Sequence, residues 1–226
     1  MTSNTPLPLR LLAAAVRVFL VMTVVLGLAY PLVMTGVAQV LFPDRADGSL
    51  VEVDGRLVGA ENIGQSFTRP VTENGRPVRS EDGALVTEPD PTYFQSRPSA
   101  AGAGYDPLSS SASNYGAEHP ELVKLVQQRR SAVVTLDGVA GSDVAPDALL
   151  ASGSGLDPHI SPAYAQQQVP RVAGERGLSP DPVRALVAEH TEGRSLGFLG
   201  EARVNVLMLN LALDALAVDP GGADSQ

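Results

Sequence analysis

The sequence contains no cysteine and no tryptophan, and its aromatic side chains are five tyrosines and five phenylalanines. Without cysteine, a disulfide framework, thiolate metal ligands and a cysteine nucleophile are all excluded. Basic residues are also few, since 16 Lys and Arg stand against 25 Asp and Glu and the formal net charge is -9. Because binding to nucleic-acid phosphates depends on clustered Lys and Arg, we expect no nucleic-acid partner.

One long apolar segment is present, and no charged side chain occurs in it from Val18 to Phe42. At about 1.5 Å per residue, a helix of this length crosses the roughly 30 Å hydrocarbon core of a lipid bilayer. A buried helix or a signal peptide cleaved near residues 36–38 would look similar, but the apolar run continues past that site, which favours an uncleaved single-pass transmembrane helix. Arg10 and Arg17 precede the helix. They predict a cytoplasmic N-terminus, and so an extracytoplasmic domain on the cell membrane.

Pro31 lies in the middle of this segment and lacks a backbone N–H, so we expect the helix to bend there. Threonine side chains can satisfy the carbonyl group that a proline leaves free. Small residues in the same segment indicate a face that packs against another membrane helix. The threonines and small residues are Thr23, Gly27, Ala29, Thr35, Gly36 and Ala38.

The chain is long enough for one ordinary domain and an appendage. We divide it into a cytoplasmic N-terminus (1–17), the transmembrane helix (18–42), a soluble domain (43–218) and a disordered tail (219–226). The predicted fold is therefore a single N-terminal transmembrane helix followed by one α+β extracytoplasmic domain. Within the domain, the turn-rich residues 71–92 should form a long surface loop, partly a small hairpin.

The first part of the domain has the pattern of strands. Asp54-Gly55 is a strong hairpin signal and predicts two strands at residues 50–53 and 56–58. A third strand should end at Pro70. The next segment, residues 93–116, is poor in large apolar side chains, so we expect an irregular loop that its aromatic residues pin to the core. These are Tyr93, Phe94, Tyr105 and Tyr115.

The second part has the pattern of helices. One should begin at Pro120, a second at Ser161-Pro162 with Pro170 bending or interrupting it, and a third at Ser179-Pro180, closed by Gly193. A final amphipathic helix should carry two faces. The apolar face would hold Val204, Leu207, Met208, Leu211 and Ala215, and the polar face Arg203, Asn210 and Asp214.

Residues 151–173, ASGSGLDPHISPAYAQQQVPRVA, contain the residue types of a serine hydrolase. Candidate groups are Ser152, Ser154, Asp157 and His159. The G-x-S-x-G turn of α/β-hydrolases is absent, however, and so is the phosphate-binding pattern G-x-x-x-x-G-K-[ST]. We therefore expect a Gly-Ser turn that leads into a helix, with Asp157 accepting backbone N–H bonds in the turn.

The patterns of the remaining polar residues favour structural roles over catalytic or metal-binding roles. His119, His159 and His190 show no metal-ligand spacing, so we expect no metal site. Gln166 to Gln168 should form a solvated helix face. Single arginines in so acidic a domain are expected to form ion pairs. They are Arg97, Arg171, Arg194 and Arg203.

Several segments of the sequence, taken in order, indicate a protein family more specifically than any of these motifs does. They are YPLVMTGVAQVLFP, NIGQSFTRP, YFQSRPSAAGAGYDPLSSSASNYG, DALLASGSGLDPHISPAYAQQQVPRVA and GRSLGFLGEARVNVLMLNLALD. Together they resemble the KdpC family, the C subunits of the Kdp high-affinity potassium-transporting ATPases, from about Ala29 to Asp214. The N-terminus, the tail and residues 71–92 fall outside the resemblance, and we interpret that loop as an insertion.

The resemblance implies an accessory, non-catalytic subunit that works with the potassium-translocating subunit KdpA, the ATP-hydrolysing subunit KdpB and the small peptide subunit KdpF. It implies no tightly bound cofactor. It also implies a catalytic chaperone that raises the ATP affinity of the pump, with ATP bound only in a complex with KdpB. The nucleotide-associated residues would be Gln168 and the turn Ser152, Gly153, Ser154 and Gly155.

Two other classes stay open from the residues alone. One is a membrane-tethered extracytoplasmic hydrolase that uses Ser154 and His159. The other is an anchored module that binds an envelope ligand. A domain outside the cell would meet little ATP. The acidity of the domain suggests another contribution, which is to raise the local cation concentration near the potassium-translocating subunit.

Overall fold

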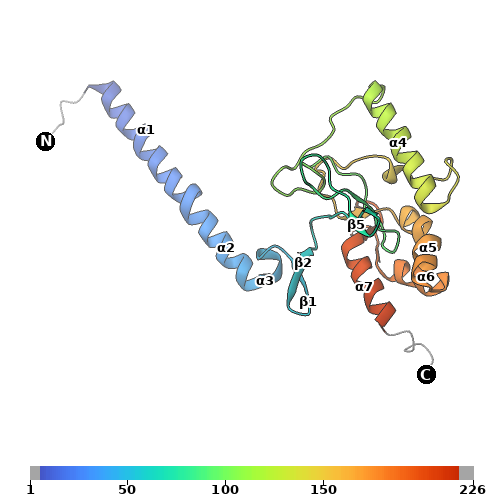
Figure 1. The fold of residues 1–226 in the computed structure, drawn as a ribbon. Coiled ribbons are helices and arrows are strands. Elements are labelled where there is room, and N and C mark those ends of the chain that lie inside the picture. Colours follow the sequence, from blue (N-terminus) through green and yellow to red (C-terminus); the bar gives the residue numbers. More distant parts are fainter. Residues whose placement is uncertain (1–5, 219–226) are drawn as a thin grey trace, which may run out of the picture. The chain divides into compact units, whose positions relative to one another are not determined.

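The computed structural model describes residues 6–218, so the predicted tail at 219–226 lies outside the described residues. The chain forms two compact units that divide between Leu50 and Val51. The first unit contains α1 (Leu7–Val24), a π-helical turn (Val25–Ala29), α2 (Tyr30–Leu41) and the short α3 (Pro43–Ala46). These elements are drawn in blue in Figure 1.

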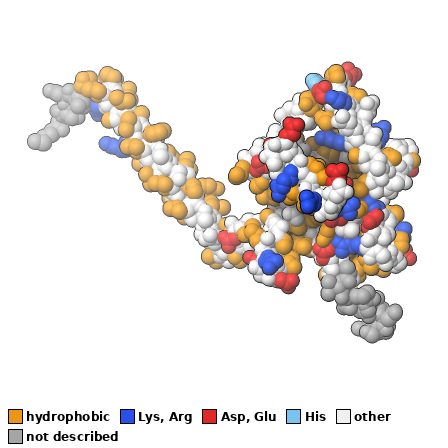
Figure 2. Space-filling view, in the orientation of Figure 1, with side chains coloured by type: hydrophobic (Ala, Val, Ile, Leu, Met, Phe, Trp, Pro, Cys, Tyr) orange, Lys and Arg blue, Asp and Glu red, His pale blue; other side chains and the backbone are white. Residues whose placement is uncertain are grey.

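The first two helices and the π-helical turn run on as one apolar helix, Leu7–Leu41, of 35 residues with a mean hydropathy of 2.5. None of its most apolar window is buried, and hydrophobic side chains cover it along its length in Figure 2. It is long and apolar enough to cross a membrane. The helix begins before Val18, so it also includes Arg10 and Arg17.

The helix departs from regular α-geometry next to Pro31, where a bend was predicted, in the form of a π-helical turn. Pro31 follows the π-helical turn, where the N–H of Tyr30 bonds to the carbonyl of Val25, five residues earlier. A π-turn inserted before a proline accommodates the missing donor. Thr23 donates its hydroxyl hydrogen to Phe19 O at 2.8 Å. This bond lies in the preceding regular helix, so Thr23 does not satisfy the carbonyl freed by Pro31.

The division falls after the first residue of the predicted hairpin, β1 (Leu50–Val53) and β2 (Arg56–Ala60), which pair in a two-stranded sheet. Its turn residues Asp54 and Gly55 have φ of 51° and 73°, the left-handed conformation that this turn requires. The predicted third strand is β3 (Thr68–Pro70), and it pairs with β6 (Thr87–Pro89) across the base of the long loop. Inside that loop β4 (Thr72–Glu73) and β5 (Arg76–Pro77) form the small hairpin.

The rest of the second unit combines helices with a three-stranded antiparallel sheet. The helices are α4 (Pro120–Asp137), a 3-10 turn (Pro146–Ala148), α5 (Pro162–Arg176), α6 (Pro180–Glu189) and α7 (Val206–Val218). The sheet has the order β7 (His159–Ile160), β9 (Arg203–Asn205), β8 (Thr191–Glu192). The α+β class is therefore confirmed.

The helix starts follow the predicted signals. Ser161 caps α5, because its hydroxyl oxygen accepts the N–H of Tyr164 at 3.0 Å. Ser179 makes no such side-chain bond, and α6 ends at Glu189 with His190 as its C-cap, so Gly193 does not close it. Pro170 lies inside α5, which continues past it to Arg176.

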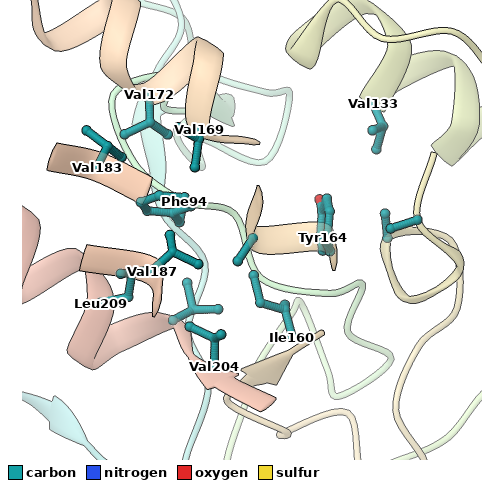
Figure 3. Packing of buried hydrophobic residues seen from close by; sticks show 14 of the residues in the cluster. Phe94, Val133, Ile160, Tyr164, Val169, Val172, Val183, Val187, Val204 and Leu209 are labelled. Atoms are coloured by element: carbon teal, nitrogen blue, oxygen red, sulfur yellow. The ribbon is translucent and has the colours of Figure 1, made fainter. Parts of the chain in front are cut away.

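Phe94 lies at the centre of the core and is fully buried. Figure 3 shows its ring among valines of α5 and α6 and Leu209 of α7. Phe94 thus pins the irregular loop to the helices, as predicted. Tyr93 contributes as well, because Arg176 of α5 lies over its ring at 4.6 Å and its hydroxyl donates to Asp214 of α7 at 3.2 Å. Tyr115 does not take part, since it is 40% exposed and stacks on His119 with ring centroids 4.6 Å apart.

The predicted faces of the last helix are correct only in part, since Val204 and Leu207 are buried and Arg203 is exposed as expected. Asn210 is 1% exposed although it was assigned to the polar face, while Ala215 of the apolar face is exposed. The side chains of the helix that enter the core are Val206, Leu207, Leu209, Asn210 and Leu213. The helix is apolar almost all round, and such a helix does not show by its pattern which face is buried.

Candidate functional site

The Gly-Ser turn, residues 151–155, uses its polar groups within its own loop. Ser152 Oγ accepts the N–H of Gly155 at 2.8 Å, and Ser154 Oγ accepts the N–H of Leu156 at 3.1 Å. The two hydroxyl oxygens are 3.4 Å apart. The serines therefore act as turn-forming groups, as the sequence predicted.

The same turn docks on the irregular loop that precedes α4. Ser154 O accepts hydrogen bonds from Ser111 N at 3.0 Å and Ser110 Oγ at 2.9 Å, and Gly155 O accepts one from Ser99 Oγ at 2.6 Å. Gly155 has a φ of 70°, and a Cβ there would meet Ala101 N at 2.7 Å. Only glycine fits this close approach of two backbones.

Asp157 holds the segment that follows the turn. Its Oδ1 accepts the N–H of His159 at 3.0 Å and lies 3.1 Å from His159 Nδ1, and its Oδ2 pairs with Arg97 Nη1 at 3.1 Å. Burial by itself would raise the pKa of Asp157, but the hydrogen bonds from His159 outweigh it and hold the pKa below its usual value. The turn-holding function predicted for this carboxylate is confirmed.

A cleft of about 310 Å³ opens beside this cluster. Its lining includes Arg97, Asp157 and His159, together with Asp147, Ser161 and Arg203. Ser161 is occupied there, since it donates its hydroxyl hydrogen to Asp147 Oδ1 at 2.9 Å while capping α5. Among the described residues no serine hydroxyl bonds to His159, so the cleft contains no assembled nucleophile and base.

The three histidines are not brought together. His119 Nδ1 accepts the N–H of Glu121 at the start of α4, and His190 Nδ1 bonds to Leu186 O at 3.0 Å. Within the part of the chain that the structure describes, no group of His, Asp and Glu has the arrangement of a metal site.

Gln168 lies in a different place and is fully buried. Its Oε1 accepts the N–H of Gln95 at 2.7 Å, and its Nε2 donates to Gln95 O at 3.1 Å. The expectation of a solvated face is therefore wrong for this glutamine. It is wrong also for the half-buried Gln167, which accepts the N–H of Ala145 and donates to Asp137, while Gln166 is exposed as expected. The side-chain amide of Gln168 thus pairs with the N–H and the C=O of Gln95, as the backbone of a neighbouring strand would.

Arg171 extends this arrangement one helical turn further. It donates to Gln168 Oε1 at 2.7 Å, to Tyr93 O at 2.9 Å and to Asp137 Oδ1 at 2.7 Å. The ion pair is deeply buried, with 4% of the Arg171 side chain and 1% of the Asp137 side chain exposed. A buried pair with this many hydrogen bonds is costly to break, because one charge would then stay buried without its partner.

Asn210 of α7 completes what we call the buried amide network, formed by Asp137, Gln168, Arg171 and Asn210. Asn210 Oδ1 accepts the N–H of Phe94 at 2.9 Å, and its Nδ2 donates to Phe94 O at 3.0 Å. The backbone of residues 93–95 is thus held from two sides. No sequence motif pointed to Asp137, and the only signal for Asn210 was a polar residue inside a strongly apolar helix.

The arginines fulfil the ion-pair prediction with one exception. Arg97 and Arg171 pair as described, and Arg203 Nη2 pairs with Glu192 Oε2 at 2.8 Å. Arg194 forms no salt bridge with any described residue.

These features define a class of protein: a long apolar N-terminal helix followed by an α+β domain whose polar clusters hold its own loops. The family model described as "KdpC: K+-transporting ATPase, c chain" matches residues 12–215. The chain therefore belongs to the KdpC family. The match begins at Leu12, earlier than the start expected near Ala29, so the N-terminal part of the apolar helix belongs to the family pattern as well.

Individual relatives agree with the family. The potassium-transporting ATPase KdpC subunit of Kineococcus radiotolerans is 53% identical over 209 residues, covering 92% of this chain and 95% of the relative. That of Streptomyces coelicolor is 49% identical over 224 residues, with 94% and 95% covered. That of Mycobacterium bovis is 43% identical, with 92% and 99% covered. The likeness extends over nearly the whole of each chain.

Proposed function

We propose that this protein is the accessory, non-catalytic subunit of an ATP-driven potassium-uptake complex and works with the subunits KdpA, KdpB and KdpF. The observation that carries the proposal is the family match across residues 12–215. The site geometry supports it, because the polar groups of the Gly-Ser turn and of the buried amide network are occupied in holding the domain together. In this proposal the domain assists assembly and stimulates the ATP-hydrolysing subunit.

Affinity purification of the full tagged chain from native membranes tests this function. Stoichiometric recovery of the potassium-translocating and ATP-hydrolysing subunits is the expected result. Deletion of the gene should also abolish growth on limiting potassium. Purification of the chain alone, with unchanged growth on limiting potassium, would contradict the proposal and favour an anchored binding module.

We further propose that the N-terminus is cytoplasmic and that the domain lies outside, where its acidity raises the local cation concentration at the entrance of the potassium-translocating subunit. The support is the position of Arg10 and Arg17 before the most apolar part of the helix and the net charge of -9. Neutralising exposed carboxylates should weaken apparent potassium affinity at low ionic strength and have less effect at high ionic strength. An unchanged affinity at low ionic strength would refute the electrostatic contribution.

The ATP-related role expected for Gln168 and the Gly-Ser turn depends on this topology. Gly153 suits a labelling test, since it is exposed and a Cβ there meets no atom within 4 Å. In this cysteine-free chain, Gly153→Cys should react with an impermeant maleimide from outside intact cells, and the control Ser3→Cys only after permeabilisation. The reverse pattern would place the turn on the ATP side and would support direct nucleotide contact.

A further inference from the structure

The hairpin that joins β8 to β9 carries three large apolar side chains directed to solvent. Leu196 is 83% exposed, Phe198 69% and Leu199 50%. We call these three residues the apolar tip. Large side chains this exposed and this close together mark a contact surface more often than single exposed leucines do.

Four backbone N–H groups around the tip form hydrogen bonds within the hairpin. The N–H groups of Ser195 and Leu199 bond to each other's carbonyl oxygens at 2.9 Å, and those of Gly197 and Phe198 bond to Arg194 O and Ser195 O. Pairing within the hairpin lowers the cost of entering an apolar medium, because fewer unsatisfied polar groups are transferred with the segment.

The backbone of Leu196 is in a conformation that is unfavourable for leucine. Leu196 has a φ of 54° and Gly197 a φ of 80°. Asparagine or glycine adopts the left-handed region more readily than a branched aliphatic residue does. A leucine held there and left exposed is better explained by a contact of its side chain than by the needs of the turn.

Charge also distinguishes the tip from the rest of this acidic chain. From Gly193 to Gly200 the one charged residue is Arg194, in a chain with a net charge of -9. Arg194 makes no salt bridge to any other described residue. A free cation beside exposed Leu and Phe matches the chemistry of a bilayer interface, where lipid phosphates lie above the acyl chains.

A short stretch of chain tethers this hairpin to the apolar helix. Asn205, at the end of β9, donates its side-chain N–H to Glu61 O at 2.7 Å. Glu61 directly follows the β1–β2 hairpin and lies 20 residues after the end of the apolar helix at Leu41. So short a tether gives the bilayer surface a high effective concentration for any weakly inserting segment.

We propose that the apolar tip inserts Leu196, Phe198 and Leu199 into the interface of the lipid bilayer that holds the N-terminal helix, with Arg194 at the phosphate level. The domain then has a second membrane contact besides its anchor. This inference goes beyond the proposed function and requires only that the helix Leu7–Leu41 is anchored in lipid.

Tryptophan fluorescence tests the proposal, because the chain has no tryptophan of its own. The full chain with Phe198→Trp is reconstituted alone into vesicles of phosphatidylcholine and phosphatidylglycerol in equal parts, with or without brominated acyl chains. Leu108→Trp is the matched control, since Leu108 is 95% exposed and lies in the irregular loop 93–116, outside the apolar tip. Leu199→Trp repeats the measurement at a second tip position.

The expected result for Phe198→Trp is an emission shift to shorter wavelength and a loss of intensity with brominated lipid, neither of which occurs for Leu108→Trp. Emission equal to that of the control and no quenching at both tip positions would overturn the proposal. A shift that appears only when the potassium-translocating subunit is added would also overturn it, in favour of a protein contact. Because the vesicles contain no other subunit, the first outcome is independent of the proposed function.

Discussion

The Gly-Ser turn and the buried amide network are both rich in polar groups, but the partners of their side chains lie at different distances along the chain. In the turn, Ser152 and Ser154 accept hydrogen bonds from residues two or three positions away. In the network, Gln168 reaches Gln95, 73 residues earlier, and Asn210 reaches Phe94, 116 residues earlier. The serines of the turn resemble a catalytic motif in the sequence, but their side chains form local hydrogen bonds. The side chains of the network match no sequence motif, yet they join segments of the domain that are far apart along the chain.

The largest loss of stability is expected when a charge in the buried amide network is left without its partner. Arg171→Ala removes the ion pair to Asp137, and should lower the free energy of unfolding by about 3–5 kcal/mol. Arg184→Ala is the control, because its pair with Asp181 is exposed and should be worth less than about 1 kcal/mol. Urea denaturation of the full chain in detergent measures both, and equal losses would show that the network is not a stabilising centre.

The next largest effect is expected in the turn, at the backbone and not at a hydroxyl group. Gly155→Ala places a Cβ against Ala101 N and Ser111 O, both at 2.7 Å, in a left-handed conformation. We expect a loss of about 2–4 kcal/mol from strain and overpacking. Gly153→Ala should be nearly neutral by the same denaturation measurement. A neutral Gly155→Ala would mean that the turn does not dock as described.

A smaller loss is expected at the glutamine. Gln168→Ala leaves the N–H and C=O of Gln95 without these partners and should cost about 1–3 kcal/mol. Gln166→Ala, on the exposed side of the same helix, should change stability by less than about 0.5 kcal/mol. If Gln168→Ala is instead as stable as the wild type but stimulates the pump less, a direct functional role for Gln168 is favoured.

The smallest effect is expected at Asp157 and should depend on pH. The lowered pKa of Asp157 means that its ionised form stabilises the folded state above the usual carboxyl pKa of 3.8, and that this contribution disappears as the pH falls through the lowered value. Asp157→Asn should therefore cost about 1 kcal/mol at neutral pH and little in acid. Melting temperatures across a pH series test this, with the exposed Asp181→Asn as the control. A cost that is the same at all pH values would contradict it.

Much of the local structure follows from nearby residues. Asp54-Gly55 predicted the first hairpin, and Pro120, Ser161-Pro162 and Ser179-Pro180 predicted three helix starts, because turns and helix caps are satisfied by groups a few positions away. The face of α7 was mispredicted in part, for the opposite reason. A helix that is apolar on nearly all sides has no periodicity to reveal that Asn210 enters the core.

The sequence by itself determined the long apolar helix, the α+β class and the family, since hydropathy, caps and ordered blocks of residues are properties of the chain. Only the tertiary structure decided what Gln168, Asp137, Asn210 and the tip residues do. Their environment is set by segments far away along the chain: a glutamine becomes buried when a loop 73 residues earlier folds over it, and a leucine stays exposed when nothing does.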